Sequence, residues 1–177
     1  MKKCIKADAI ANEHIYNNFR DFLLYEHLYL NCKFIKLLRK DEYYTNNSTG
    51  INKFMHIIVR RKKNKLATKL GFTIPANVFD EGLRIWHYGN IVVNGQAKVG
   101  RNCVMHGDNC IGNNGFDKKA PRIGNNVDIG VGAKIIGDIE IADGIIIGAN
   151  SVVNKSFLEP NVVIAGVPAK IIKNKLE

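Results

Sequence analysis

The second half of the chain places an aliphatic residue or a methionine at almost every sixth position. This run comprises Val93, Val99, Met105, Ile111, Ile123, Ile129, Ile135, Ile141, Ile147 and Val153. A six-residue period is typical of a parallel β-helix, in which each hexapeptide supplies one short strand and three strands make one triangular coil. The pattern predicts that these side chains point inward and stack from one coil to the next.

The residues beside the aliphatic positions suit tight corners. Small residues follow them at Gly100, Gly112, Gly124, Gly130, Ala142 and Gly148. Asn and Asp, which tolerate the left-handed backbone conformation, occupy adjoining positions at Asn102, Asn125, Asn126, Asp138, Asp143 and Asn150. A β-sandwich is disfavoured, because its strands recur about every 8–12 residues without fixed corner chemistry. We expect about five coils between Phe72 and Pro168.

The first part of the chain has a helical pattern instead. Apolar residues such as Phe34, Ile35 and Leu38 recur at helical intervals, and a second apolar series ends at Gly71. The sequence therefore predicts an α+β protein with two regions. Residues 1–70 form a small N-terminal helical region, and residues 71–177 form the β-helix with a C-terminal tail.

The composition indicates the size of the core and the cellular compartment. With 177 residues, 46% hydrophobic and 24% charged, the chain is long enough for one main core and a smaller appended unit. The cysteines Cys4, Cys32, Cys103 and Cys110 form no CxxC pair, which favours a reduced compartment and gives no indication of zinc. No run approaches the roughly 18 apolar residues of a membrane span, so the expected localisation is cytoplasmic.

The net charge of +10 is concentrated between Gly50 and Gly71, where seven Lys or Arg residues occur. Such a cluster favours an anionic partner, although a solvated helix face is the simpler interpretation. No nucleic-acid-binding motif accompanies the cluster, so we expect no nucleic-acid partner. Peripheral association with a membrane surface is the favoured alternative.

One interruption breaks the hexapeptide period, between Ile111 and Ile123. The intervening residues 113–122 read as a loop pushed out of the prism. Loops carried on rigid scaffolds commonly line functional sites, so we expect this loop to contribute to one.

The hexapeptides, the segment Gly89–Gly100, the loop after Gly112 and the ending Ala165–Lys170 together resemble the left-handed β-helix acyltransferases. The likeness is strongest to the serine acetyltransferase-like branch, including O-acetyltransferases associated with bacterial capsule and lipopolysaccharide synthesis. The resemblance implies a left-handed β-helix, a homotrimer, no metal, and acetyl-CoA bound as co-substrate in the cleft between neighbouring prisms.

The resemblance also places a catalytic histidine at His87. An imidazole suits this role, because its pKa lets it accept a hydroxyl proton and return a proton to the departing thiolate. Acceptor contacts are expected from Trp86, Tyr88, Phe72, His106 and Asp108. For His106 a structural role remains open, with Asp108 as the partner that would satisfy its ring.

Acetyl-CoA contacts carry over where the motif matches. They fall at Gly112, Asn113, Val131, Gly132, Ala133, Ala149, Lys155 and Lys170. The lysines, with Lys118, Lys119 and Arg122 of the loop, suit the nucleotide phosphates. Each Gly and Ala is also needed simply to turn a corner, so that structural role stays open.

Four ionic positions of the serine-acetylating pattern are absent. Trp86, Phe72 and Ala120 replace two aspartates and a histidine, and a carboxylate is missing near Asn94. Because buried charges need partners, L-serine is the poorer fit, and aromatic faces suit a sugar ring. The sequence thus predicts an acetyl-CoA-dependent O-acetyltransferase acting on a carbohydrate hydroxyl of a capsular or other surface polysaccharide or its precursor. The basic surface favours an acidic glycan.

Three alternatives remain at this point. In the first, the acceptor is serine, as in cysteine biosynthesis, with Asp41, Glu42 or Asp80 supplying the missing carboxylates. In the second, the prism is a non-catalytic trimeric scaffold or binding module. The third, a zinc hydratase, needs three converging imidazoles, and the prism contains only two histidines.

Overall fold

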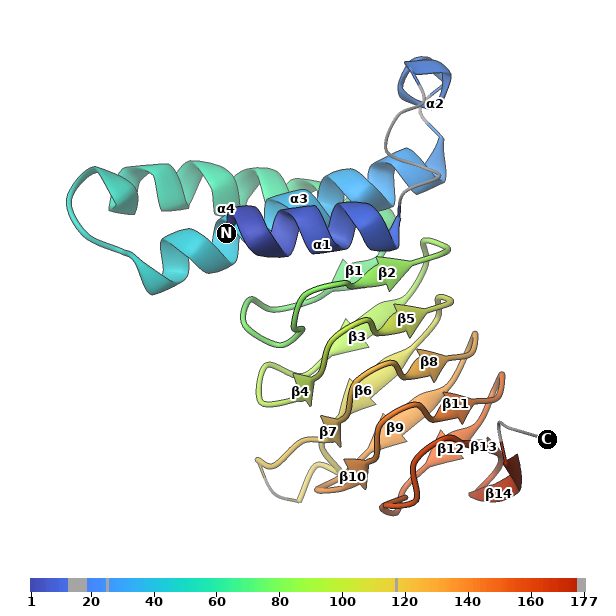
Figure 1. Ribbon diagram of the computed structural model, residues 1–177. Helices are drawn as coiled ribbons and strands as arrows, with labels where there is room; N and C mark the ends of the chain where they lie inside the picture. Colours follow the sequence, from blue (N-terminus) through green and yellow to red (C-terminus); the bar gives the residue numbers. More distant parts are fainter. Residues whose placement is uncertain (13–18, 25, 117, 175–177) are drawn as a thin grey trace.

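The computed structural model describes residues 1–12, 19–24, 26–116 and 118–174. Within these residues, helices α1 (Lys2–Ala11), α2 (Phe19–Leu23), α3 (His27–Asn46) and α4 (Ile51–Leu70) precede the strands. Helices α1, α3 and α4 lie across one end of a three-sided prism, whose strands succeed one another down its length (Figure 1). Helix α4 ends at Gly71, which adopts the left-handed conformation with φ of 77°.

Parallel strands form the three faces of the prism. Face A contains β1 (Phe72–Thr73), β3 (Ile91–Val93), β6 (Cys110–Gly112), β9 (Lys134–Ile136) and β12 (Val152–Val153). Face B contains β4 (Lys98–Val99), β7 (Arg122–Ile123) and β10 (Glu140–Ile141). Face C contains β2 (Arg84–Ile85), β5 (Val104–Met105), β8 (Asp128–Ile129), β11 (Ile146–Ile147) and β13 (Val162–Gly166). Strand β14 (Ala169–Asn174) returns antiparallel to β13.

The six-residue period is confirmed. All ten residues of the aliphatic run are buried and belong to one continuous core. Asn102, Asn126 and Asn150 occupy corners with φ of 56°, 56° and 54°, a conformation that asparagine tolerates. The sequence pattern therefore predicted which side chains point inward and where the corners lie.

The interruption is a loop outside the prism, as expected. Glu140 on β10 pairs with Arg122, which lies eighteen residues earlier, whereas Arg122 pairs with Lys98, twenty-four residues earlier. The six extra residues form the excursion between β6 and β7. Phe116 in this loop is 96% exposed, so the loop places a large apolar side chain in solvent.

The helices share the core of the prism. Phe34, Ile35 and Leu38 of α3 are fully buried in the same cluster as the inward residues of the coils. The ring of Phe34 packs edge-on against that of Phe72 at 5.0 Å between centroids. The first coil is thus covered by apolar helix side chains, which shield the open end of the core from water.

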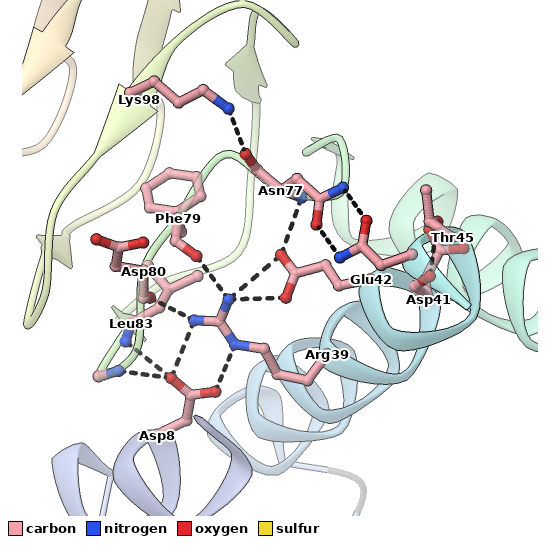
Figure 2. A network of polar contacts seen from close by, with 12 residues as sticks. Asp8, Arg39, Asp41, Glu42, Thr45, Asn77, Phe79, Asp80, Leu83 and Lys98 are labelled. Atoms are coloured by element: carbon pink, nitrogen blue, oxygen red, sulfur yellow. Dashed lines mark hydrogen bonds and ion pairs between the residues drawn. The ribbon is translucent and has the colours of Figure 1, made fainter. Parts of the chain in front are cut away.

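Polar helix side chains bind the free backbone groups of that first coil. The Asp8 carboxylate accepts hydrogen bonds from the N–H groups of Gly82 and Leu83, at 2.8 and 3.0 Å. The Arg39 guanidinium donates to Asp8 and to the carbonyl oxygens of Phe79 and Asp80 (Figure 2). Burial opposes the charge of Arg39, but its bonds to Asp8 and the nearby Glu42 raise its pKa.

A second ionic cluster joins α3 to α4. The buried Asp41 carboxylate lies 2.7 Å from Nζ of Lys63 and 3.1 Å from both Nε of Arg60 and Nε2 of His56. Burial opposes ionisation of Asp41, yet Lys63 and Arg60 outweigh it and hold the Asp41 pKa below its usual value. The carboxylate is therefore ionised in the fold at neutral pH.

Replacing Asp8 by Ala should lower the free energy of unfolding by about 3–5 kcal/mol, because Arg39 would stay buried without its partner. Urea unfolding measures this loss, with the exposed Glu159→Ala as a control expected to change stability by less than about 0.5 kcal/mol. The double variant Asp8→Leu/Arg39→Met should also remain less stable than the wild type, because four backbone groups lose their partners. A double variant as stable as the wild type would contradict this capping role.

Asp41 should make stability pH-dependent in the acid range. Because its folded pKa is lowered, it stabilises the fold above its unfolded pKa, and that contribution is lost as pH falls below about 4 through the folded pKa. Urea midpoints from about pH 6 to about pH 3 should therefore fall more steeply for the wild type than for Asp41→Asn. Parallel curves for the two proteins would count against the ion cluster as the cause.

Candidate functional site

One corner of the prism gathers most of the chemistry. It is the corner at which the chain turns from face C to face A, and we call it the histidine corner. Coil by coil it comprises residues 86–88, 106–108, 130–132 and 148–150. Backbone hydrogen bonds join its coils, from Gly132 N–H to the Gly107 carbonyl and from Asn150 N–H to the Val131 carbonyl. Since coils are spaced about 4.8 Å apart, the corner is a straight ladder that starts at His87.

His87 stands exposed at the first rung of this ladder. Its backbone is held on two sides. The buried side-chain amide of Asn31 on α3 donates to the carbonyls of Ile85 and Trp86, and Gly107 lies directly over His87 in the next coil. A Cβ on Gly107 would come within 3.3 Å of the His87 Cβ. The histidine is therefore presented on rigid backbone with an accessible ring.

A second histidine lies beside it. The ring of His27, at the start of α3, stacks on that of His87 with 5.8 Å between centroids and 23° between planes. His27 also meets the Tyr88 ring edge-on at 5.9 Å. Sequence reasoning did not select His27 or Asn31, because sixty residues separate His27 from His87 and no periodic pattern links them.

His106 occupies the second rung, but its partner differs from the one expected. Its Nε2 lies 2.9 Å from the carboxylate of Asp128 on β8, rather than that of Asp108. Asp108 instead accepts a hydrogen bond from Lys134 at its carbonyl and has the Lys134 ammonium 3.5 Å from its carboxylate. The His106–Asp108 pairing that the sequence left open is not formed, because Asp128 in the next coil faces the same corner.

Trp86 is a packed platform at this corner. The guanidinium of Arg84 lies over its ring at 3.7 Å, and the His106 ring stacks near it at 6.2 Å. Phe72 does not join this surface. It is buried against Phe34, so the expected acceptor contact of Phe72 is not available at the surface.

The predicted acetyl-CoA residues fall into two groups. Val131, Gly132 and Ala149 lie on the histidine corner, where Val131 and Ala149 are exposed, while Ala133 is buried in the core. The other predicted positions lie away from this corner within one chain. Gly112 ends strand β6 of face A at its opposite edge, Asn113 and Lys155 follow strands of the same face, and Lys170 is exposed on β14.

Two of the three carboxylates considered as substitutes are engaged elsewhere, and the third, Asp80, lines a cavity on face B. Asp41 belongs to the cluster with Lys63, and Glu42 binds Arg39 and the backbone N–H of Asn77 (Figure 2). Asp41 lies fourteen residues beyond His27 along α3, a distance of about 21 Å. The cavity on face B is large and open, with a volume of about 1000 Å³. Arg39, Lys98 and Arg101 are among the residues that line it. None of its lining residues belongs to the histidine corner.

The chain is similar to serine acetyltransferases. It is 36% identical over 104 residues to the serine acetyltransferase of Mycobacterium tuberculosis, covering 58% of this chain and 43% of that protein. For the Buchnera aphidicola enzyme the identity is 37% over 108 residues, covering 56% and 39%. The chain thus spans less than half the length of these two relatives. No protein-family model matches it.

Solved structures extend the similarity to nearly the whole chain. The serine acetyltransferase of Brucella abortus superposes with a TM-score of 0.78 at 27% identity, covering 98% of this chain and 69% of that one. Its complex with coenzyme A gives a TM-score of 0.76 at the same identity, covering 98% and 68%. The α+β fold with a left-handed β-helix, implied by the resemblance, is confirmed.

These similarities correct one prediction. The named relatives and structures are serine acetyltransferases, so the carbohydrate acceptor expected from the four absent ionic residues was wrong. The similarity favours the serine alternative. It also gives no support for a special closeness to capsule or lipopolysaccharide enzymes.

The histidine corner requires glycine at position 130. A Cβ there would lie 2.7 Å from the Ala149 nitrogen and the Ile147 oxygen, so backbone would have to move. Gly130→Ala should therefore cost about 1–3 kcal/mol in urea unfolding. Gly95→Ala is the matched control, because its Cβ would meet only Pro75 at 3.7 Å. Equal stability of the two variants would show that the corner is less tightly packed than described.

Proposed function

We propose that this chain, as a relative of the serine acetyltransferases, transfers the acetyl group of acetyl-CoA to the hydroxyl of L-serine. The observation that carries the proposal is the exposed His87 at the head of a ladder of small residues. The similarity of nearly the whole chain to a serine acetyltransferase solved with coenzyme A supports it. The His87 imidazole then acts as the general base.

The chemistry needs one proton carrier. His87 accepts the proton of the serine hydroxyl as that oxygen attacks the thioester carbonyl carbon. The tetrahedral intermediate collapses, the carbon–sulfur bond breaks, and the imidazolium returns the proton to the CoA thiolate. No acyl-enzyme forms in this direct transfer. The Asn31 amide and Gly107 serve the reaction by fixing the backbone on either side of His87.

Ionic groups for an amino acid are present at the histidine corner, although not at the positions where the resemblance expects them. Serine carries an ammonium and a carboxylate, and each needs a partner of opposite charge. We assign the ammonium to the Asp108 carboxylate, which is exposed two residues after His106. We assign the carboxylate to the guanidinium of Arg84, which lies beside the corner over the ring of Trp86 at 3.7 Å.

We assign the thioester end of acetyl-CoA to the same ladder. Val131, Gly132 and Ala149 offer a narrow track of small side chains along which a pantetheine arm can lie close to the backbone. The phosphates then fall to Lys155 and Lys170, with Gly112 and Asn113 at the loop edge. Within one chain this loop edge lies across face A from the histidine corner, so we infer that a neighbouring copy supplies it.

A homotrimer meets that requirement, and the outward residues of the faces support it. A threefold ring uses two different patches on each subunit. Faces A and C, which meet at the histidine corner, carry outward apolar residues such as Val92 and Ile146. Face B carries Lys98, Arg122 and Glu140 outward and suits solvent.

Replacing His87 by Ala should lower kcat by about 10²–10⁴-fold, because the variant loses its general base. The KM for acetyl-CoA should change little, since the ring contributes to proton transfer rather than to binding of the pantetheine. Thiol release in the presence of L-serine measures both constants. His56→Ala, whose ring lies in the α3–α4 ion cluster, is the matched control and should keep its activity. A His87→Ala protein with full kcat would refute the mechanism.

Acceptor choice needs its own test. Thiol release should rise with L-serine and stay at background with D-serine, L-threonine or glycerol, and mass spectrometry should identify O-acetylserine. Arg84→Gln should raise the KM for serine more than it lowers kcat, because it removes the group assigned to the carboxylate. Binding of acetyl-CoA without any serine-dependent release would overturn the acceptor and leave the cofactor assignment standing.

A further inference from the structure

Helix α4 carries a surface that neither the fold nor the proposed reaction uses. Its twenty residues include seven Lys or Arg and no Asp or Glu. Its buried side packs through Val59, Leu66 and Leu70. On the remaining surface Ile51, Phe54 and Ile57 are 76%, 61% and 67% exposed. Large apolar side chains in solvent on a surface helix call for an explanation.

The helical period orders these residues into one face. At 100° per residue, Phe54, Ile57, Arg61 and Lys65 fall within an arc of about 80°, opposite the buried side. The exposed apolar residues lie in the first half of α4, together with Lys53, and the other Lys and Arg residues lie from Arg60 onward. We call this surface the α4 face, comprising Ile51, Phe54, Ile57, Arg61, Lys62, Lys65 and Lys69.

Most of the positive charge on the α4 face is not neutralised. Asp41 pairs with Lys63 and Arg60, which lie toward α3. Within the described residues, Arg61, Lys62, Lys65 and Lys69 have no ion pair. All four are exposed. The face therefore combines free cations with exposed apolar side chains.

We propose that the α4 face binds an anionic lipid surface. A helix that inserts apolar side chains at the headgroup level, while its Lys and Arg meet anionic headgroups, has this composition. No helix within the described residues is long and apolar enough to cross a membrane, so the contact is one that lies on the bilayer. This proposal does not depend on the acceptor or on His87.

Two other occupants fit the face less well. A nucleic acid would engage the cations but leave Ile51, Phe54 and Ile57 in water. Pairing of two α4 faces across a twofold axis would leave the cations without partners of opposite charge, because α4 contains no Asp or Glu. An anionic bilayer satisfies both the apolar and the basic halves of the helix.

The test is co-sedimentation of the full chain with vesicles of phosphatidylcholine alone and of phosphatidylcholine mixed with phosphatidylglycerol. We expect binding to the mixed vesicles only, weakening as salt is raised because the charges are screened. Arg61→Glu/Lys65→Glu should reduce binding at least about tenfold. Phe54→Ser/Ile57→Ser should reduce it at unchanged net charge.

The matched control is Lys2→Glu/Lys6→Glu on α1. Both exposed lysines lie on another helix, and the change lowers the net charge from +10 to +6, as in Arg61→Glu/Lys65→Glu. Binding should persist in the control, and circular dichroism should show that every variant is folded. Equal losses in the two charge variants would reduce the effect to net charge and overturn the proposal.

Three further outcomes would also overturn it. The first is no excess binding to anionic vesicles over neutral ones. The second is a change in sedimentation velocity for Phe54→Ser/Ile57→Ser without vesicles, which would assign the face to a second copy of the chain. The third is binding of duplex DNA that exceeds vesicle binding and is lost in Arg61→Glu/Lys65→Glu.

Discussion

The open end of a β-helix is the constraint on which this structure depends. A first coil has strands on one side only, so its outward backbone groups and its core would both meet water. Here the helices close that end with apolar and polar groups together. Phe34 covers the core, while Asp8 and Arg39 take up N–H and C=O groups that a preceding coil would have bonded. Asn31 extends the same cap to the carbonyl next to His87, so the stability of the end and the placement of the imidazole have one origin.

The sequence was sufficient for the fold because the signal repeats. Ten apolar positions that keep one six-residue phase are compatible with few folds other than a β-helix. Asparagines in the left-handed backbone conformation lie at the corners that the period predicts. Phe72 could have been placed correctly as well, since it precedes Ile74 by two residues and alternate residues of a strand share a side. The polar cap over the first coil could not be predicted from such a pattern. Asp8 and Arg39 are single polar residues that bind backbone groups 75 and 40 residues away.

The sequence predicted the site at His87, where the family resemblance was specific, but it did not indicate which charged groups surround that residue. Four absent ionic residues suggested a carbohydrate acceptor rather than serine, but charged groups reach the histidine corner from other coils. Asp128 does so after the six-residue loop has shifted the simple count of eighteen residues per coil. His27 reaches the corner from a helix. A missing side chain at one aligned position is therefore weak evidence against a substrate when each rung of a ladder can supply a replacement.

Because successive coils are evenly spaced, the rungs of the histidine corner follow one another in equal steps along the prism. Each complete coil moves a rung by one fixed increment, about 4.8 Å, without altering the chemistry of the rung itself. Loss or gain of eighteen residues would thus change the length of the track between His87 and its last rung in discrete steps. Changes of one or two residues are taken up between the strands of a coil, as where Arg84 pairs with Val104 twenty residues later, whereas the six extra residues of one coil collect in the loop after Gly112. The number of coils therefore sets the length of the track along the corner. The loops are free to vary the side chains that would contact a ligand.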